Sequence, residues 1–332
     1  MDTHGTDGRI ARYARLSPDT VLDAVEARGF ACDGQLLALN SYENRVYQVG
    51  LVDGRRLIAK FYRPLRWSDA AILEEHRYTL ALAAAELPVA APLDCGGATL
   101  LQHAGYRYAL YPRLTGRAPE LDRPETLHQL GRLLARIHNI GALEPFRERP
   151  VLSMAEFGEA PVRFLLEGGW LPAELRPAYE TLTRDLLAGI RACFAHAGQP
   201  RSLRLHGDCH AGNVLWAADG PWLVDFDDAR QGPAIQDLWM FLSGDRDYLR
   251  ARLGELLEGY SAFRRFDARE LHLVEALRSL RMLHHAAWLA RRWDDPAFPR
   301  AFPWFNTTRF WQEHILSLRE QLALLQEPPL SL

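Results

Sequence analysis

One stretch decides the fold of this chain, His206-Gly207-Asp208-Cys209-His210-Ala211-Gly212-Asn213, followed after a short hydrophobic segment by Val224-Asp225-Phe226-Asp227-Asp228. An Asp that precedes an Asn by a few positions, with a further Asp at the end of the next strand, is typical of a phosphoryl-transfer site. In such sites the first Asp accepts the proton of the attacking hydroxyl, while the Asn and the later Asp hold Mg²⁺ against the phosphates. The motif predicts Asp208 as proton acceptor and Asn213 and Asp225 as magnesium ligands, Asp225 being a catalytic residue through the metal.

A second and independent feature is the lysine content. Lys60 is the only lysine in the chain, and it lies in the apolar, strand-like pattern Arg56-Leu57-Ile58-Ala59-Lys60-Phe61. A sequence so biased toward arginine would replace lysine wherever arginine serves, so Lys60 indicates a site that needs a compact ammonium. The lysine that contacts ATP phosphates from the third strand of kinases occupies such a site. The alternative is a lysine kept by chance at a solvated strand end.

Composition and charge narrow the class of protein. The 332 residues are 48% hydrophobic, which is enough for a sizeable core and, by length, for about two domains. The net charge of −3 gives no support for a nucleic-acid or membrane surface. The four cysteines form no C-x-x-C pair and are expected to be free thiols in a reducing compartment. Without a signal peptide or a long apolar run, we expect a soluble, cytoplasmic protein.

Hydrophobic periodicity predicts the order of the elements. We expect a short helix from Pro18 to Arg28 and strands between Leu36 and Phe61. Ser68 is a plausible N-cap for a helix through about Ala85, and a hairpin follows with Tyr106 to Tyr111 as its second strand. Beyond residue 113 the pattern is mainly helical, with the motif as an interruption.

The sequence therefore predicts an α+β fold of two lobes. We expect a flexible N-terminus over residues 1–16 and a small β-rich N-lobe with one long helix over residues 17–112. A larger, mainly helical C-lobe over residues 113–332 would carry the catalytic loop and the metal site. ATP is expected in the cleft between the lobes, where cofactor sites commonly form.

The motif resembles the catalytic region of the aminoglycoside phosphotransferase, choline kinase and homoserine kinase superfamily, whose fold is protein-kinase-like. Longer segments resemble one branch, the bacterial stress response kinase A family, and the likeness covers nearly the whole chain from about residue 16. That resemblance implies a cytoplasmic Ser/Thr protein kinase linked to stress survival and protection against programmed cell death. The segments are Leu39–Gln48, Lys60–Pro64, Gly232–Trp239, Arg291–Pro299 and Leu325–Leu330.

The resemblance also assigns roles to single residues. It places Asp208 at the proton-acceptor position, and Asn213 and Asp225 at the Mg²⁺ positions. Ser41 stands at the ATP-loop position, Lys60 at the phosphate-binding lysine and Glu75 at its partner on the helix. Glu74 is the rival for that partner role, but an inward Glu75 also directs Tyr78 toward the lobe.

Several residues near the motif keep two interpretations. Asp227 either binds a second metal or orients the neighbouring metal carboxylate, or else it makes a structural hydrogen bond. Asp228 is expected to be structural, and Asp237 to brace the backbone of the catalytic loop. His206 is expected to pack and orient that loop, whereas His210 either faces the cleft or is a satisfied loop histidine. The aromatic residues from 288 to 311 either line an acceptor site or form core.

Two functions compete. The resemblance favours a Ser/Thr protein kinase, with ATP and a protein hydroxyl as substrates. A small-molecule hydroxyl kinase stays open, because the loop Asn40–Asn44 departs from G-x-G-x-x-G and Gly207 replaces the Arg of regulated protein kinases. A non-catalytic nucleotide-binding scaffold is disfavoured by the intact set of candidate catalytic residues. We expect a monomer that binds neither nucleic acid nor membrane.

Overall fold

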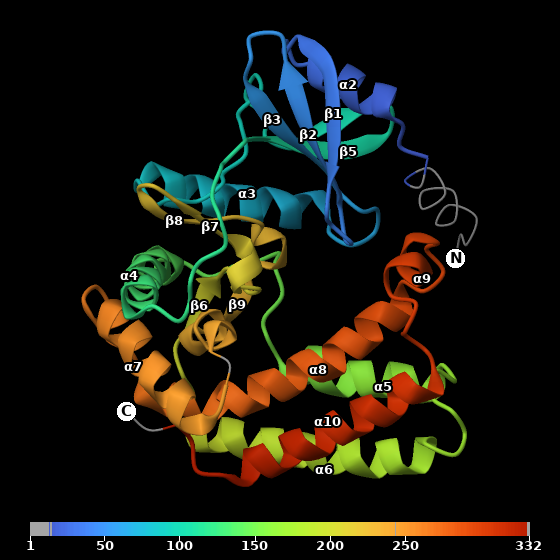
Figure 1. Cartoon of the computed structure of the whole chain (residues 1–332), viewed down its shortest axis with the longest axis vertical. Helices are drawn as coiled ribbons and strands as arrows, with labels where there is room; N and C mark the ends of the chain where they lie inside the picture. The colour runs from blue at the N-terminus through green and yellow to red at the C-terminus, as the bar shows by residue number, and fades with distance from the viewer. Residues whose placement is uncertain (1–12, 14, 243, 331–332) are drawn as a thin grey trace. The chain divides into compact units, whose positions relative to one another are not determined.

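The computed structural model describes residues 13, 15–242 and 244–330, which form two compact units (Figure 1). The first comprises Met1–Glu120, Phe146–Arg149 and Ala211–Ala229, and the second Leu121–Pro145, Pro150–His210 and Arg230–Leu332. The β-rich lobe expected over residues 17–112 lies within the first unit, which also takes in the second half of the motif.

The N-terminal segment differs in part from the expectation of a flexible tail over residues 1–16. Residues 1–12 and 14 lie outside the described residues. Tyr13 and Leu16 are buried, and the Tyr13 hydroxyl donates to the Phe61 carbonyl at 3.1 Å.

The first unit is built on a five-stranded antiparallel sheet in the order β1-β2-β3-β5-β4. Alternate residues of β3 face opposite sides: Leu57 and Phe61 belong to the core beneath α2, whereas Ile58 packs with Tyr62 on the other side. Lys60 shares the parity of Ile58, and it pairs with Val46 on β2 in the sheet register. The strands are β1 (Cys32–Leu39), β2 (Arg45–Leu51), β3 (Arg56–Phe61), β4 (Leu101–His103) and β5 (Tyr106–Pro112).

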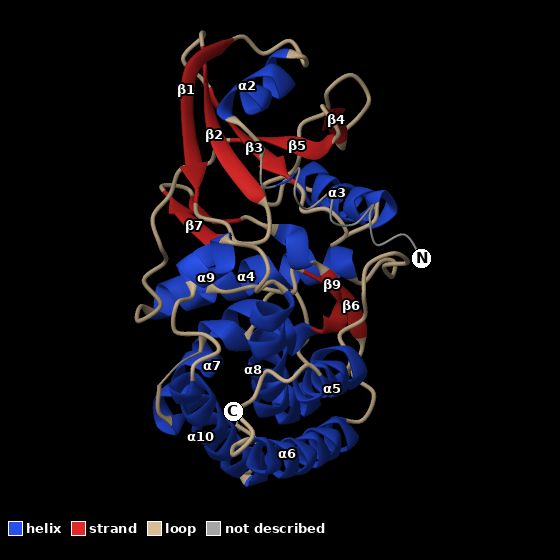
Figure 2. Cartoon of the chain, turned by 90° about the vertical axis from the view of Figure 1, so that its right-hand side faces the viewer, coloured by secondary structure: helices blue, strands red, loops and turns tan. Residues whose placement is uncertain are grey.

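In the described part of this unit, two α-helices and a β-hairpin accompany the sheet. Helix α2 (Pro18–Glu26) packs against the sheet (Figure 2), and α3 (Asp69–Ala84) begins at Ser68, whose side chain accepts from the Ala71 N–H. The predictions of both helices are confirmed. Strands β7 (Val214–Ala217) and β8 (Gly220–Leu223) form a hairpin that adds to the unit through an isolated bridge between Leu223 and Val89.

The second unit is mainly helical. Figure 1 shows α5, α6, α8 and α10 alongside one another, while β6 pairs antiparallel with β9. The α-helices are α4 (Pro124–Gly141), α5 (Ala160–Glu167), α6 (Arg176–Ala197), α7 (Arg246–Ser261), α8 (Val274–Arg291), α9 (Ala297–Ala301) and α10 (Thr308–Gln326), and the strands are β6 (Ser202–Leu205) and β9 (Arg230–Pro233). A π-turn covers Ala155–Glu159, and the chain's 3₁₀ turns cover Ala211–Asn213, Phe226–Asp228, Ala234–Asp237, Trp239–Phe241 and Ala268–Leu273.

Helices α4 and α7 cross in backbone contact. A Cβ atom on Gly131 would lie 2.0 Å from the Leu256 carbonyl oxygen, and one on Gly259 would lie 2.0 Å from the His128 carbonyl oxygen. Real Cβ atoms do not approach an oxygen so closely, so both positions require glycine at this spacing.

The aromatic residues near the C-terminus are mostly core. Phe298, Phe305 and Trp311 are at most 2% exposed, whereas Trp304 is 47% exposed. This favours the core interpretation for most of the cluster. Among the described residues, no helix has both the length and the hydropathy needed to cross a bilayer.

Candidate active site

Lys60 lies buried on the central strand β3 and faces two carboxylates. Its Nζ atom is 2.9 Å from Asp225 Oδ1 and 3.3 Å from Asp227 Oδ1. Its side chain is 8% exposed, whereas that of Asp225 is 52% exposed. Burial lowers the pKa of Lys60, but the carboxylates of Asp225 and Asp227 hold that pKa well above its usual value. Lys60 is therefore a buried, charged ammonium and does not lie at a solvated strand end.

The two neighbouring glutamates of α3 have different surroundings. Glu74 accepts hydrogen bonds from the backbone N–H groups of Arg147, Glu148 and Arg149 at 2.7, 2.8 and 2.9 Å, so its carboxylate fixes that segment. Glu75 is 2% exposed, and burial raises its pKa to about 7 although Lys60 lowers it. In the part of the chain that the structure describes, no ion pair joins Lys60 to Glu75. Lys60 acts on Glu75 at longer range than on Asp225.

The hairpin β7–β8 brings the two predicted metal ligands to the same end. Asn213 directly precedes β7, and Asp225 follows β8 by one residue. Because Val214 pairs with Leu223, the chain ends meet, and the Val224 N–H donates to the Asn213 carbonyl at 3.0 Å. Asp225 adopts the left-handed conformation, with φ of 61°, which is uncommon outside glycine and typical of functional positions. An exposed carboxylate beside an amide is a donor set that suits a hard divalent cation.

Two arginines fix the loop that follows Asp225. The Arg66 guanidinium contacts the Asp227 carboxylate and lies 2.9 Å from Asp228 Oδ1. Arg149 donates to the Ala229 carbonyl at 2.8 Å and to the Asp227 carbonyl. Burial raises the pKa of Asp227, but Arg66 and Lys60 hold it below the usual value, so the carboxylate is charged. These contacts support an orienting role for Asp227 and a structural role for Asp228.

Neither arginine was predicted from the sequence. Arg66 lies 161 positions from Asp227, and Arg149 lies 78 positions from it. The only local signal was that Arg66 falls between the lysine strand and the N-cap Ser68. Ser41, the predicted ATP-loop residue, is half-buried in the connection between β1 and β2.

Asp208 belongs to the second unit, in the loop after β6. Its carboxylate contacts the guanidinium of Arg281 on α8, and its Oδ2 atom is 3.4 Å from His210 Nε2. Arg281 is a further residue that sequence reasoning missed. No signal in the sequence distinguishes it from the other arginines of α8.

Asp237 braces the Asp208 loop, as predicted. Its two carboxylate oxygens accept from the backbone N–H groups of His206 and Gly207, both at 2.8 Å. His138 Nε2 is 3.2 Å from the same carboxylate, and although burial raises the pKa of Asp237, the His138 hydrogen bond contributes to a net lowering. Gly207 has φ of 86°, a conformation that an arginine side chain would make strained.

Nearly the whole chain is similar to known phosphotransferases and kinases. A family model described as "Phosphotransferase enzyme family" matches residues 35–277. Stress response kinase A of Salmonella choleraesuis (strain SC-B67) is 45% identical to this chain over 320 residues, covering 96% of this chain and 97% of that protein. A protein of Salmonella typhimurium (strain LT2), named Serine/threonine protein kinase RdoA, matches with the same identity over the same shares.

Solved structures with similar folds are phosphotransferases. The amicoumacin kinase hAmiN, solved with AMP-PNP, Ca²⁺ and Ami, superposes with a TM-score of 0.72 at 19% identity over 96% of each chain. The microcompartment-associated aminopropanol kinase gives a TM-score of 0.68 at 18% identity over 91% of this chain and 96% of that one. At these identities they show the fold alone, and the predicted α+β kinase-like fold is confirmed.

Proposed function

The chain belongs to the phosphotransferase enzyme family and is an ATP-dependent kinase, and from this premise we propose that it phosphorylates Ser or Thr hydroxyls of a protein substrate. The relatives at 45% identity over 96% of the chain, one of them named as a Ser/Thr protein kinase, support the protein acceptor. The departures at Asn40–Asn44 and Gly207 keep a small-molecule hydroxyl kinase as the second candidate.

One structural observation supports phosphoryl transfer at this site, whichever acceptor is used: the only lysine of the chain is buried 2.9 Å from the exposed Asp225 carboxylate. Lys60 would pair with nucleotide phosphates through the same ammonium. The buried Glu75 adds a further carboxylate whose charge acts on Lys60. Ser41 would add a hydroxyl from the β1–β2 connection to the phosphate-binding loop.

Asn213 and Asp225 would hold Mg²⁺. The residues fit this ion, because they offer an amide oxygen and a half-exposed carboxylate oxygen from the two ends of one hairpin. When bound, Mg²⁺ neutralises negative charge on the transferring phosphoryl group. Asp227, held by Lys60 and Arg66, keeps the loop of Asp225 in place.

Asp208 would accept the proton of the acceptor hydroxyl as the oxygen attacks phosphorus. Two backbone N–H bonds to Asp237 fix the loop that carries it, so its carboxylate needs little reorganisation. Arg281 would orient this carboxylate, since the guanidinium already contacts it.

The test is transfer of labelled γ-phosphate from ATP into a bacterial extract that is then separated into protein and metabolite fractions. We expect label on phosphoserine or phosphothreonine in the protein fraction. Asp208→Asn should lose at least about 10²-fold of this transfer, because an amide cannot accept the proton, while Asp219→Asn on the exposed β7–β8 turn should retain it. Label confined to metabolites would replace the protein acceptor by a small alcohol.

A further inference from the structure

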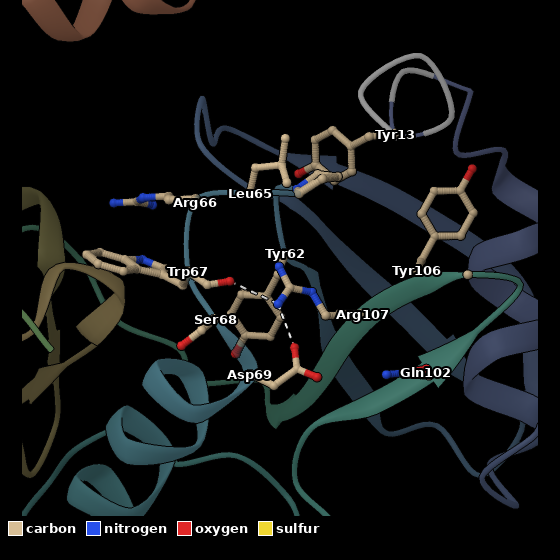
Figure 3. A pocket seen from close by; sticks show the side chains of 12 residues that line it. Tyr13, Tyr62, Leu65, Arg66, Trp67, Ser68, Asp69, Gln102, Tyr106 and Arg107 are labelled. Atoms are coloured by element: carbon tan, nitrogen blue, oxygen red, sulfur yellow. Dashed lines mark hydrogen bonds and ion pairs between the residues drawn. The ribbon is translucent and has the colours of Figure 1, made fainter. Parts of the chain in front are cut away.

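A cavity of about 590 Å³ lies within the first unit (Figure 3), and its lining includes neither Lys60 nor Asp225. Its walls come from Tyr13, from the connection between β3 and α3, and from the β4–β5 hairpin. The volume falls within the range of small-molecule sites. The aromatic residues that line it are Tyr13, Tyr62, Trp67 and Tyr106.

Arg107 supplies the cavity with a positive group. Figure 3 shows its side chain reaching from β5 toward the start of α3, where its Nη1 atom is 2.6 Å from Asp69 Oδ1. The same guanidinium donates to the carbonyls of Trp67 at 2.9 Å and Arg63 at 3.4 Å. The Arg107 side chain is 20% exposed, whereas that of Asp69 is 54% exposed. The carboxylate is therefore the exchangeable member of this network, while the backbone bonds hold the arginine in place.

We propose that this cavity binds a small aromatic anion, whose ring packs against Trp67 and Tyr106 and whose anionic group pairs with Arg107, and that its occupancy tightens divalent-cation binding at Asp225. Exchange of the exposed Asp69 carboxylate for a ligand carboxylate keeps Arg107 paired, so no buried charge is left alone. The half-buried rings of Trp67 and Tyr106 offer edge-to-face packing to an aromatic ring. The first turn of α3 adds a positive partial charge on the same side.

The route to the metal loop runs through the segment between β3 and α3. Leu65 lines the cavity. Arg66 contacts the loop after Asp225 directly, and Trp67 contacts it through Arg149. Arg66 pairs with Asp227 and Asp228. Arg149 stacks on Trp67, with its Cζ atom 4.0 Å from the centroid of the Trp67 ring. Arg149 also donates to the Ala229 carbonyl. One segment therefore forms a cavity wall and holds the metal loop.

The backbone conformation of Leu65 makes the conformation of this segment depend on the contacts around it. Its φ is 67°, in the left-handed region that a leucine rarely adopts, and its side chain is exposed. Contacts at both ends must hold such a residue in place. A ligand that fills the space beside Leu65 and fixes Arg107 would stabilise the segment, and with it the position of Arg66. The loop of Asp225 would then need less ordering when the cation binds.

The binding site is tested with benzoate as probe, against benzyl alcohol as neutral and acetate as non-aromatic comparators. Protein labelled with 5-fluorotryptophan is titrated by ¹⁹F NMR, and the Trp67 resonance is assigned with Trp67→Phe. We expect benzoate to shift this resonance saturably below about 10 mM, and to bind at least about tenfold more tightly than either comparator, a difference of about 1.4 kcal/mol. Equal binding of benzyl alcohol, or no saturable shift, would overturn the site.

Two variants with opposite expected signs separate recognition from damage to the fold. Arg107→Gln should weaken benzoate binding by at least about tenfold, because the charge-assisted bond is lost. Asp69→Asn should strengthen it by about threefold or more, because the competing charge is removed. The exposed pair Asp53 and Arg55, whose side chains are 51% and 66% exposed, offers matched controls that should change nothing. Weakening in both cavity variants would overturn the assignment.

The coupling rests on the proposed metal role of Asp225 and is tested separately. Binding of Mn²⁺, followed by electron paramagnetic resonance, should tighten at least about twofold at saturating benzoate, and Mn²⁺ should tighten benzoate by the same factor. Unchanged Mn²⁺ affinity would overturn the coupling. Loss of all Mn²⁺ binding with benzoate binding intact would overturn both the coupling and the metal assignment, and would leave the cavity site standing.

Discussion

Arg281 on α8 contacts the carboxylate of Asp208, which lies 73 positions earlier in the chain. The Arg281 side chain is 47% exposed and that of Asp208 is 25% exposed, so the pair is accessible to a substrate. A guanidinium beside the proposed proton acceptor can orient that carboxylate and stabilise negative charge near it.

Arg281→Gln should therefore lower kcat by about 10- to 100-fold with little change in KM for ATP, because it alters the transition state more than nucleotide binding. Arg281→Lys should recover part of the loss, since a positive charge remains. Steady-state kinetics with labelled ATP measures both constants. Arg278→Gln, one turn earlier and paired with Glu275, is the control. An equal loss in the control would show that α8 was simply disturbed.

Lys60 offers a labelling test without competing lysines. An acyl-phosphate derivative of ATP should acylate Lys60, and excess ATP should prevent the reaction, because the ammonium would lie at the nucleotide phosphates. Lys60→Arg should abolish the label and impair turnover, since a broad guanidinium does not fit a site shaped for a point charge between Asp225 and Asp227. Peptide mass spectrometry identifies the modified residue. Labelling that ATP does not block, together with full activity of the Arg variant, would contradict the assignment.

Asp225→Ala should weaken Mn²⁺ or Mg²⁺ binding by at least about tenfold, because the change removes a direct ligand rather than a supporting contact. Calorimetric titration of the metal with a non-hydrolysable ATP analogue measures this. Asp219→Ala changes an exposed carboxylate on the turn of the same hairpin and should leave metal affinity intact. Unchanged affinity in Asp225→Ala would remove this residue from the metal site.

Glu75 should make stability fall as pH rises. Its pKa is raised from 4.5 to about 7 by burial, so the folded protein binds a proton that the unfolded chain has released. The contribution is fully present below pH 4.5 and is lost as pH rises through about 7. The stability of Glu75→Gln relative to the parent should therefore rise over this range, by at most about 3 kcal/mol.

Denaturant unfolding at several pH values measures this difference. Burial raises the pKa of Glu270 to about 7, but this group is present in parent and variant and cancels in the comparison. His76, whose pKa burial lowers to about 3, lies 3.8 Å from the Glu75 carboxylate, so the measured difference belongs to the two groups together. The exposed Glu258→Gln is the control. A difference between Glu75→Gln and parent that does not vary with pH would contradict the raised pKa.

Gly131→Ala should destabilise the protein by about 3 kcal/mol, since its methyl group would collide with the Leu256 carbonyl and force the helices apart. Gly254→Ala on α7 is the control, because its added Cβ would meet nothing within 4 Å. A helical glycine in open space should instead gain a few tenths to 1 kcal/mol from the substitution. Equal stability of the two variants would show that α4 and α7 can move apart without a loss of stability.

Local patterns sufficed for much of the fold. Ser68 identified the start of α3 because an N-cap side chain and a run of helix-forming residues lie side by side in the sequence. Asp237 could be predicted to brace the Asp208 loop because its segment, Gly232–Trp239, resembles the same family as the His206–Asn213 motif. These features depend on short-range chemistry or on motif spacing, and both are visible along a single chain.

Long-range partners could not be predicted in this way. Arg66, Arg149 and Arg281 each act on a residue more than 70 positions away. Because nearly every cationic side chain here is arginine, composition gives no means of separating these three from solvated ones. The assignment of the β7–β8 hairpin to the β-rich unit likewise depends on the bridge from Leu223 to Val89, a contact that tertiary packing sets and periodicity does not reveal.

The glycine contact between α4 and α7 limits how this protein can change through evolution. No side chain lies between the two backbones there, so a larger residue cannot be absorbed by new rotamers and would have to be accompanied by a shift of a whole helix. Such a shift would break the hydrogen bond between His138 Nδ1 on α4 and the Tyr260 hydroxyl on α7, which are 2.9 Å apart. The other ring nitrogen of His138 contacts the Asp237 carboxylate, so that contact would be disturbed as well. Both positions are therefore expected to remain glycine as the rest of the sequence diverges.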